Sequence, residues 1–382
     1  MYNILKLNKI AEIGTSRLGD NYNCVDECAT PDAVLVRSAS MHDMELPESL
    51  LAIARAGAGV NNIPLDKCTQ KGICVFNTPG ANANAVMELV IAGLFMGSRK
   101  LVDGINWAKS LKGNGDQVLK MVEKGKSQFA GPEIKGKTIG VIGLGAIGIL
   151  VANAARALHM NVIGYDPYFS VQAALKLSRH VQTVSNLDEL YAKCDYITVH
   201  VPLVADTKGM INEATIAKMK DGVRILNFSR DGLVVSADIK KALESGKMGA
   251  YVTDFATDDL LDVDGVVPLP HLGASTPESE DNCAIMAADE VKDYLENGNI
   301  TNSVNFPCVC MPRTGDTRFC VFHQNAPKII AKLLEAIGGN VENMENKSRG
   351  DFAYTIIDAT APNADAQASL EAIDGIIKLR VL

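Results

Sequence analysis

Apolar and polar residues alternate along the chain with two periods, one typical of buried strands and one typical of helices. Short apolar runs recur in the first hundred residues, at 4–8, 33–38, 50–57 and 72–78. Runs of this length predict buried strands. Residues 84–100 instead predict a mostly buried helix. Residues 103–130 are polar and less regular, and they hold the only tryptophan, Trp107, so they predict an arm or crossover.

From residue 137 the alternation of strands and helices becomes cleaner. Strands are predicted at 138–143, 161–166, 180–184, 196–201, 223–229, 249–255 and 266–270. The helices between them carry capping signals at Asn186, Asn212 and Ser236. A longer helix is predicted from Pro277, with Thr276 as its N-cap, to about Asn297. This alternation predicts an α/β fold with a doubly wound parallel sheet.

The last 65 residues follow a different order. They are read as strand, helix, two strands, helix and strand, which is the βαββαβ order of a small ferredoxin-like module. We therefore expect a substrate-binding domain in 1–98 and 280–306 and a nucleotide-binding domain in 99–279. A linker at 307–317 and the C-terminal module in 318–382 complete the expected organisation.

Composition narrows the class of protein. The 382 residues carry a net charge of −8, which argues against a nucleic-acid partner. Nine cysteines without CxxC pairs indicate reduced thiols and a cytoplasmic protein, with no metal site. The start has no signal-peptide pattern. Residues 138–155 lack charge over nearly the length of a membrane span, but the glycines among them favour a protein with no membrane partner.

A dinucleotide motif follows the predicted strand at 138–143. Gly143, Gly145 and Gly148 form a G-x-G-x-x-G pattern that opens a helix. The glycines allow a tight turn, close approach of a pyrophosphate to the helix N-terminus, and close packing of helix and strand. Asp166 follows 18 residues after Gly148 and suits a ribose diol, so NAD is favoured over NADP. The alternative is a glycine-rich turn without a ligand.

Polar residues at or just after strand ends are candidates for three roles in chemistry on a hydroxy acid. His271 follows the predicted strand 266–270, at the edge where open α/β sheets bind ligands, and an imidazole suits a general base. Arg230 follows strand 223–229, and its planar guanidinium suits a carboxylate. Asp254 or Asp258 would support the imidazolium. Alternatively, His271 is a structural histidine, Arg230 forms a structural ion pair with a nearby acid, and the two aspartates are solvated loop residues.

The sequence resembles the D-isomer-specific 2-hydroxyacid dehydrogenases over nearly the whole chain. The resemblance rests on ARAGAGVNNI, VFNTPGANANAVMELV, GKTIGVIGLGAIG, CDYITVHVPL, RILNFSR and PHLGASTPES, in that order. It implies a Rossmann NAD domain, a flavodoxin-like substrate domain, and catalysis by Arg230, Asp258 and His271. The family's acid is a Glu, and Asp259 is a neighbouring candidate. Asp231 replaces the family's usual Gly after the catalytic Arg.

The resemblance also assigns the remaining binding positions. Further NAD contacts are implied at Ala58, Ala146, Ile147, Val201, Phe228, Ser229, Arg230, Asp254, Gly273 and Ala274. The substrate carboxylate is expected beside Gly57 and Ala58, together with Arg230 and His271. Arg37 matches a phosphate-binding Arg, and its alternative is a surface Arg at a strand end. The expected substrate is a small phosphorylated 2-hydroxy acid. Another 2-hydroxy acid, or a non-catalytic NAD sensor, is the alternative.

The C-terminal module resembles an ACT domain, an amino-acid-sensing fold. His323 and Asn325 lie in the stretch that resembles its effector loop, and Asn340 matches a second effector contact. The resemblance implies an L-serine effector and a homodimer or homotetramer. Lys328 replaces the usual Gly after Pro327. A plain dimerisation module is the alternative.

Overall fold

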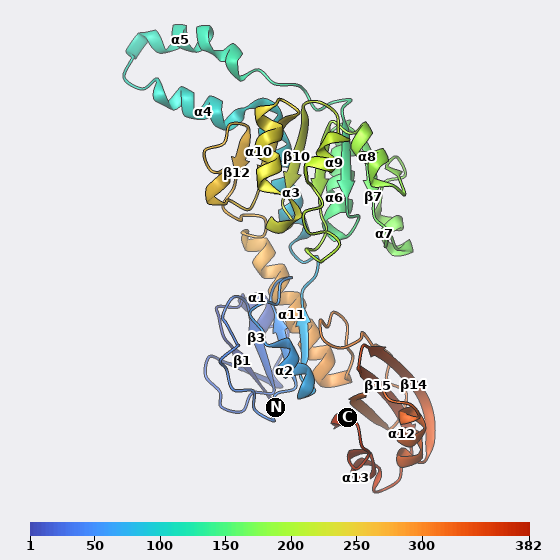
Figure 1. Ribbon diagram of the computed structural model, residues 1–382. Helices are drawn as coiled ribbons and strands as arrows, with labels where there is room; N and C mark the ends of the chain where they lie inside the picture. The colour runs from blue at the N-terminus through green and yellow to red at the C-terminus, as the bar shows by residue number, and fades with distance from the viewer. The chain divides into compact units, whose positions relative to one another are not determined.

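Three β-sheets organise the chain in the computed structural model, which describes all 382 residues (Figure 1). The chain divides into two compact units. Unit 1 consists of residues 1–81 and 277–382, and unit 2 of residues 82–276. Two sheets belong to unit 1 and the third belongs to unit 2.

The first sheet of unit 1 is parallel, with the strand order β2-β1-β3-β4-β5. Its strands are β1 (Tyr2–Lys6), β2 (Tyr22–Val25), β3 (Ala33–Val36), β4 (Ala52–Arg55) and β5 (Cys74–Asn77), with helices α1 (Glu12–Thr15) and α2 (Leu65–Gln70) between them. This is the order of flavodoxin-like sheets. The apolar runs predicted four of the strands, whereas β2 has no apolar run to reveal it.

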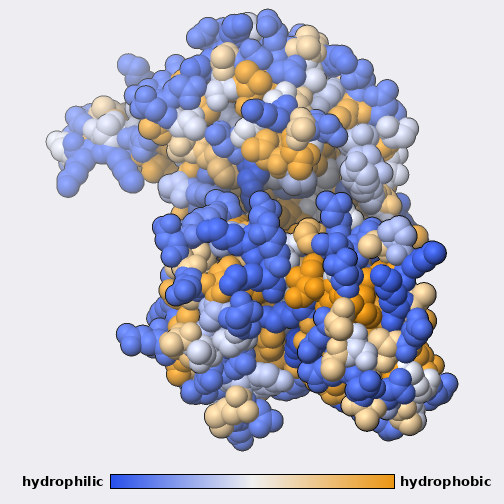
Figure 2. Space-filling view, turned by 60° about the horizontal axis from the view of Figure 1, so that its bottom comes forward, coloured by the Kyte–Doolittle hydropathy of each residue, from blue (hydrophilic) through white to orange (hydrophobic).

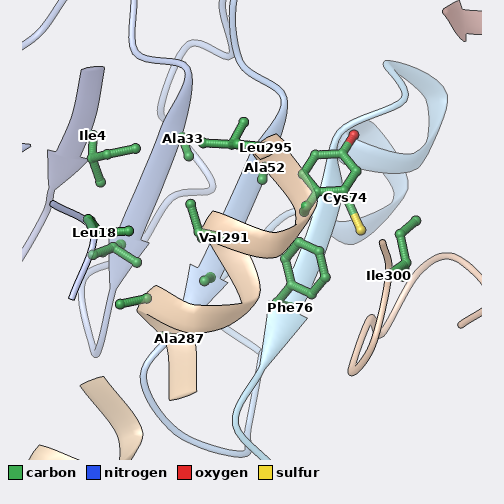
Figure 3. Close-up of a cluster of buried hydrophobic side chains, with 14 of the residues drawn as sticks. Ile4, Leu18, Ala33, Ala52, Cys74, Phe76, Ala287, Val291, Leu295 and Ile300 are labelled. Carbon is green, nitrogen blue, oxygen red and sulfur yellow. The ribbon is translucent and has the colours of Figure 1, made fainter. Parts of the chain in front are cut away.

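Helix α11 (Pro277–Asn297) packs over this sheet and supplies much of the core of unit 1. Ala287, Val291 and Leu295 on the helix face Ile4, Ala33, Ala52 and Phe76 on the strands (Figure 3). The sequence prediction that this helix begins at Pro277 and ends near Asn297 is confirmed.

The sheet of unit 2 is also parallel and has the order β12-β11-β10-β9-β6-β7-β8. Its strands are β6 (Thr138–Ile142), β7 (Asn161–Tyr165), β8 (Gln182–Thr183), β9 (Tyr196–Val199), β10 (Val223–Asn227), β11 (Met248–Thr253) and β12 (Val266–Pro268). Its helices include α6 (Ala146–Ala157), α7 (Val171–Lys176), α8 (Leu187–Lys193), α9 (Glu213–Ala217) and α10 (Ser236–Glu244). The strand order reverses between β6 and β9, which is where doubly wound sheets bind ligands. The predicted α/β fold is confirmed.

Helix α3 (Ala83–Arg99) belongs to unit 2, although the sequence analysis placed residues 83–98 in the first domain. It packs on α6, β10 and β11. Gly93 and Gly97 allow this close approach, since a Cβ at Gly93 would lie 2.6 Å from the Phe228 ring and one at Gly97 3.0 Å from Val252. Packing against the second sheet therefore sets the point at which the chain crosses between the units.

Residues 101–129 form a helical arm that extends from unit 2 (Figure 1). The arm comprises α4 (Leu101–Ser110), α5 (Val118–Gly125) and two short 3-10 helices, η1 (Gly115–Gln117) and η2 (Lys126–Phe129). The ring centroids of Trp107 and Phe129 lie 5.3 Å apart, so the arm has its own small aromatic cluster. The polar composition predicted an arm but not its helices.

The C-terminal module has an antiparallel sheet with the order β14-β15-β13-β16. Its elements are β13 (Thr317–Gln324), α12 (Ile329–Ile337), β14 (Asn340–Arg349), β15 (Phe352–Thr360), α13 (Ala366–Glu371) and β16 (Ile376–Val381). The predicted βαββαβ order is thus present. Phe319 and Val321 face helices α12 and α13, whereas Cys320 and Phe322 face the opposite way.

The face without helices joins the core of unit 1. Phe322 and Tyr354 pack in the same cluster as Tyr294 of α11 and Phe306, which lies in the segment between α11 and β13. Arg380 donates to the carbonyls of Tyr294 and Leu295, and the Tyr354 hydroxyl donates to the Gly298 carbonyl. Cations near the last helical carbonyls offset the negative end of the helix dipole. The module is therefore built onto the end of α11.

The predicted N-cap residues and the predicted linker at 307–317 agree with the structure only in part. Asn186 and Asn212 accept hydrogen bonds from the first turns of α8 and α9, as predicted. The prediction for Ser236 is wrong, because Ser236 is itself the first residue of α10 and makes no capping bond. The linker at 307–317 has no helix or strand up to residue 316, but Val309 is fully buried in the core of unit 1.

Two other features of the chain are clear from the structure. None of its helices combines the length and the apolar character that crossing a membrane requires. All nine cysteines are free thiols.

The buried pair Arg318–Asp358 generates a stability prediction. Both side chains are fully buried, with Nε–Oδ1 and Nη2–Oδ2 distances of 2.6 and 2.7 Å, and Arg318 also donates to the Asn297 carbonyl. We expect Asp358→Asn to lower the free energy of unfolding by about 3 kcal/mol, because it leaves a buried guanidinium without its counter-charge. Urea unfolding measures this. The exposed pair Lys193–Glu189 is the control, and Glu189→Gln should cost less than about 0.5 kcal/mol. Equal effects would contradict the assignment.

Candidate active site

The glycine turn between β6 and α6 has the shape that the dinucleotide motif predicts. Gly143 has φ +94°, and a Cβ at Gly148 would lie 1.8 Å from the Gly143 carbonyl oxygen. A Cβ at Gly145 would meet nothing within 4 Å, and no side chain caps the start of α6. The turn therefore leaves an open cradle at a helix N-terminus, which fits a pyrophosphate. Ala146 and Ile147 begin the helix beside it.

Asp166, at the end of β7, lies against this turn. Its Oδ2 accepts a hydrogen bond of 2.8 Å from the backbone N–H of Leu144, and its Oδ1 accepts one from Tyr168. The carboxylate is thus held at the edge of the cradle. This position fits the predicted preference for a ribose diol over a 2′-phosphate.

Strand β9 ends on the other side of the switch point, at His200 and Val201. The His200 Nε2 lies 2.9 Å from the Thr198 hydroxyl, and its Nδ1 is buried without a partner. Burial lowers the pKa of His200 to about 3. The ring is therefore neutral at physiological pH.

Arg230 lies exposed just after β10, and the backbone around it is fixed by a buried amide. Asn227 donates from Nδ2 to the Arg230 carbonyl at 2.9 Å, and its Oδ1 accepts from the Ser229 N–H. Ser229 in turn donates from Oγ to the Val201 carbonyl at 2.7 Å, which joins the ends of β9 and β10. The sequence analysis did not single out Asn227, although a buried Asn at a strand end was a usable signal.

His271 lies exposed after β12 with φ +57°, a left-handed backbone conformation. Asp254, which is 1% exposed, holds the next two residues: its carboxylate oxygens accept the N–H groups of Leu272 and Gly273, each at 2.7 Å. A sparsely populated conformation persists only where its surroundings fix it, and such residues cluster at functional sites. The sequence offered Asp254 as a partner of the imidazolium or of NAD, whereas in the structure its carboxylate positions the backbone after His271.

The neighbouring loop also approaches His271. The ring centroids of Phe255 and His271 lie 5.0 Å apart, and Phe255 pairs with Pro270 in an isolated bridge. Asp259 forms an ion pair with Lys240 and accepts from Thr257. Asp258 is exposed and forms no ion pair, so it is not held by another side chain in this way.

The remaining predicted cofactor residues of unit 2 fall at the same edge of the sheet. Phe228 follows β10 but is largely buried beneath α3. Gly273 is buried against Asp254, and Ala274 follows it. The carboxyl ends of β6, β9, β10, β11 and β12 thus gather the glycine turn, Val201, Ser229, Arg230, Asp254 and His271 on one edge.

Unit 1 carries the predicted substrate residues at the carboxyl ends of β3 and β4. Arg37 forms an ion pair of 2.6 Å with Glu280 in the first turn of α11. Arg55, which the sequence analysis missed, donates from Nε to the Arg37 carbonyl, and its guanidinium fills the space beside Gly57. Ala58 follows, with its carbonyl bound by Asn77. Two guanidinium groups thus lie at adjacent strand ends.

The predicted effector residues of the C-terminal module are not one exposed cluster. His323 is 1% exposed, and its ring nitrogens lie 2.7 Å from the Gln324 carbonyl and 2.8 Å from the Thr355 hydroxyl. Asn325 is exposed and donates to the Gly350 carbonyl, while Asn340 donates to Glu342. The imidazole is thus already engaged inside the module.

Comparison with known proteins agrees with this geometry. Residues 93–273 match the family described as D-isomer specific 2-hydroxyacid dehydrogenase, NAD binding domain. The chain is 36% identical over 333 residues to the D-3-phosphoglycerate dehydrogenase of Archaeoglobus fulgidus, covering 84% of this chain and 60% of the relative. The corresponding enzyme of Bacillus subtilis is 33% identical over 337 residues, covering 86% of this chain and 61% of the relative. The chain thus spans about 60% of the length of these curated relatives.

Solved structures give the same assignment of fold. The NAD-bound 3-phosphoglycerate dehydrogenase of Entamoeba histolytica is 26% identical, with a TM-score of 0.59 over 80% of this chain and 98% of that chain. A glyoxylate reductase from Paecilomyes thermophila is also 26% identical, with a TM-score of 0.65 over 79% of this chain and 98% of that chain.

The lowered pKa of His200, whose side chain is partly buried, generates a prediction for the pH dependence of stability. Its pKa is about 3 in the folded chain and about 6.5 when unfolded, so the unfolded state binds more protons as the pH falls. The contribution is fully present above pH 6.5 and is lost progressively toward pH 3. Between pH 7 and pH 5 it should remove about 2 kcal/mol of stability.

Urea unfolding at the two pH values measures this loss in the wild type and in two variants. His200→Asn should lose correspondingly less stability on acidification. His180→Asn, which changes an exposed histidine, should behave as the wild type. Identical losses in all three proteins would show that His200 does not carry the effect.

Proposed function

We propose that this chain, whose residues 93–273 form a D-isomer specific 2-hydroxyacid dehydrogenase NAD-binding domain, oxidises 3-phospho-D-glycerate to 3-phosphohydroxypyruvate. This reaction would begin the synthesis of L-serine. The observation that carries the proposal is the convergence of Arg230 and His271 on the strand edge that holds the dinucleotide cradle. The names of the curated relatives support the choice of substrate.

The chain's own side chains supply the acid–base and binding steps. Bound NAD supplies a hydride acceptor for the hydrogen on C2 of the substrate. His271 takes the proton of the C2 hydroxyl as the C–O bond becomes a carbonyl, and an imidazole suits this because it titrates near neutral pH. Arg230 binds the substrate carboxylate through its planar guanidinium. Asp258 stabilises the imidazolium, and Asp254 keeps His271 in place.

The phosphate is assigned to Arg37 and Arg55. Guanidinium groups bind phosphate oxygens by charge-assisted hydrogen bonds, and two of them at adjacent strand ends suit a dianion. Arg37 is paired with Glu280, and both side chains are nearly half exposed. A phosphate can therefore replace this carboxylate at modest cost, since exposed ion pairs contribute little.

A second candidate substrate is an unphosphorylated 2-hydroxy acid. The glyoxylate reductase has the same identity to this chain as the 3-phosphoglycerate dehydrogenase and a higher TM-score. Arg37 and Arg55 distinguish the two, because an unphosphorylated substrate has no group for them.

NADH formation with 3-phospho-D-glycerate tests the function directly. His271→Asn removes the imidazole while keeping a residue that tolerates positive φ, and it should lower kcat by about 10²- to 10⁴-fold. His159→Asn is the matched control, because His159 is exposed and also has positive φ; it should keep full activity. Arg37→Met and Arg55→Met should raise KM for 3-phosphoglycerate by at least about tenfold and leave that for D-glycerate unchanged.

Each alternative gives a different result in this assay. Turnover of D-glycerate or glyoxylate at equal efficiency, unaffected by Arg37→Met, would favour an unphosphorylated substrate. NADH binding without turnover of any 2-oxo acid would favour a non-catalytic sensor.

For oligomerisation, we propose that the arm mediates association with a second copy of the chain. The surface of the arm that the space-filling view shows is mainly hydrophilic (Figure 2). Nevertheless, five large apolar side chains of α4 and α5 are exposed: Leu101, Val102, Ile105, Leu119 and Met121. The arm is thus amphipathic. Exposed apolar clusters of this kind mark interaction sites.

Light scattering with size-exclusion chromatography tests the arm. Leu119→Glu should shift the mass toward that of a single chain, because a charge would be buried in the contact. Leu175→Glu is the matched control, since Leu175 on α7 is 83% exposed and Leu119 is 79% exposed. A dimer or tetramer unchanged in both variants would place the contact elsewhere.

For the C-terminal module we propose a structural role first, because its sheet completes the core of unit 1 and its His323 ring is already engaged. An L-serine effector site at Asn325 and Asn340 is the alternative. The same NADH assay with added L-serine separates them, since only an effector site would make the rate depend on serine.

A further inference from the structure

The backbone around Arg230 is held at two points by one buried amide, that of Asn227. The Asn227 Oδ1 accepts from the Ser229 N–H at 3.2 Å, and its Nδ2 donates to the Arg230 carbonyl at 2.9 Å. The two bonds fix the chain just before and just after Arg230, whose own backbone is extended at φ −153° and ψ 149°. The direction in which the guanidinium leaves the backbone therefore depends on the orientation of this amide.

The same amide also contacts Tyr251 on the neighbouring strand β11. Asn227 Nδ2 donates to the Tyr251 hydroxyl at 3.3 Å. The Tyr251 ring is 2% exposed and lies in one core cluster with Ile225, its partner in the register of β10 and β11. The ring thus fills the core, while its hydroxyl extends to the amide at the carboxyl end of β10.

Thr253 extends this network to the loop beside His271. It is fully buried and pairs in register with Asn227. Its Oγ1 accepts from the Phe255 N–H at 3.1 Å, and the Phe255 ring lies against the His271 ring. Burial raises the pKa of Tyr251, and hydrogen bonds from Thr253 and Asn227 oppose the shift. The Tyr251 hydroxyl therefore lies between the groups that hold the two candidate catalytic loops.

The torsion of the Asn227 side chain explains why a third partner matters. The last torsion of an asparagine side chain has a broad energy minimum, so the amide can rotate unless its partners select one orientation. Buried hydrogen-bond networks supply this selection when every member is satisfied. A phenylalanine in place of Tyr251 would fill the same core but would leave one N–H of the amide without its acceptor.

We propose that Tyr251 is a positioning residue for Arg230: its hydroxyl fixes the Asn227 amide, and the amide sets the direction of the guanidinium that binds the substrate carboxylate. Tyr251 itself touches neither substrate nor cofactor in this assignment. The inference rests on the proposed function only through the role of Arg230 as the group that binds the carboxylate.

Two measurements on the full chain test the role of Tyr251. One is KM for 3-phospho-D-glycerate, and the other is the dissociation constant of oxamate, a carboxylate that is not reduced, from the complex with NADH, followed by NADH fluorescence. Tyr251→Phe should raise both constants by about three- to tenfold. It should leave kcat and the KM for NAD within about twofold, because a lost contact that is equally strong in the ground and transition states affects binding alone.

Tyr196→Phe is the matched control. Tyr196 is fully buried at the start of β9, at the opposite end of the same sheet, and its hydroxyl accepts a hydrogen bond from Ser98. This variant loses an equally buried, hydrogen-bonded hydroxyl, so it should leave both constants unchanged.

Asn227→Leu shows whether Tyr251 acts through the amide. It should raise both constants at least as much as Tyr251→Phe does, and combining the two substitutions should cause no further rise, because residues that act as one unit are not additive. Unchanged constants in Tyr251→Phe, an equal rise in Tyr196→Phe, or independent effects in the double variant would overturn the proposal.

The oxamate measurement separates this inference from the proposed function. The expected loss of oxamate binding in a chain that does not turn over 3-phospho-D-glycerate would refute the proposed substrate and still support the role of Tyr251. Normal turnover with unchanged constants in Tyr251→Phe would refute the role of Tyr251 alone. A wild type that binds no oxamate and shows no turnover would overturn both.

Discussion

The candidate active site depends on the hydrogen bonds that the buried carboxylate of Asp254 accepts. This carboxylate has no cationic partner and is stabilised by two backbone N–H groups, those of Leu272 and Gly273. Breaking either bond would leave a buried charge short of donors, which is costly. The loop after β12 is therefore tied to the end of β11, and His271 keeps a left-handed backbone at the ligand edge of the sheet.

The same principle, a buried charge fixed by specific partners, recurs where the C-terminal module meets α11. Arg318 and Arg380 bring guanidinium groups to the carbonyl end of this helix, and Asp358 compensates Arg318 inside the core. The opposite end of α11 carries Glu280, the partner of Arg37. One helix thus connects the packing of the module with the residues assigned to the substrate phosphate.

Much of this fold follows from the sequence because strands buried on both faces appear as short apolar runs, and capped helices fall between them. The positions of the glycine motif, Asp166, Arg230 and His271 were predictable because each follows a predicted strand at its carboxyl end. Strand β2 was not, because it lacks an apolar run. The crossing before α3 was also missed, since it depends on how Gly93 and Gly97 fit against the second sheet. The roles of Asp254 and Arg55 depend on hydrogen bonds between separate segments of the chain, which no local pattern reveals. Asn227 was missed although its bonds to Ser229 and Arg230 are local.

In the reaction that we propose, His271 and Arg230 face the reacting carbon of a 2-hydroxy acid beside bound NAD. A crystal structure of the chain with NAD and 3-phospho-D-glycerate measures this directly. We expect a His271 ring nitrogen within hydrogen-bond distance of the C2 hydroxyl and the Arg230 guanidinium on the carboxylate. A complex in which the substrate binds with both side chains turned away from its C2 carbon would contradict it.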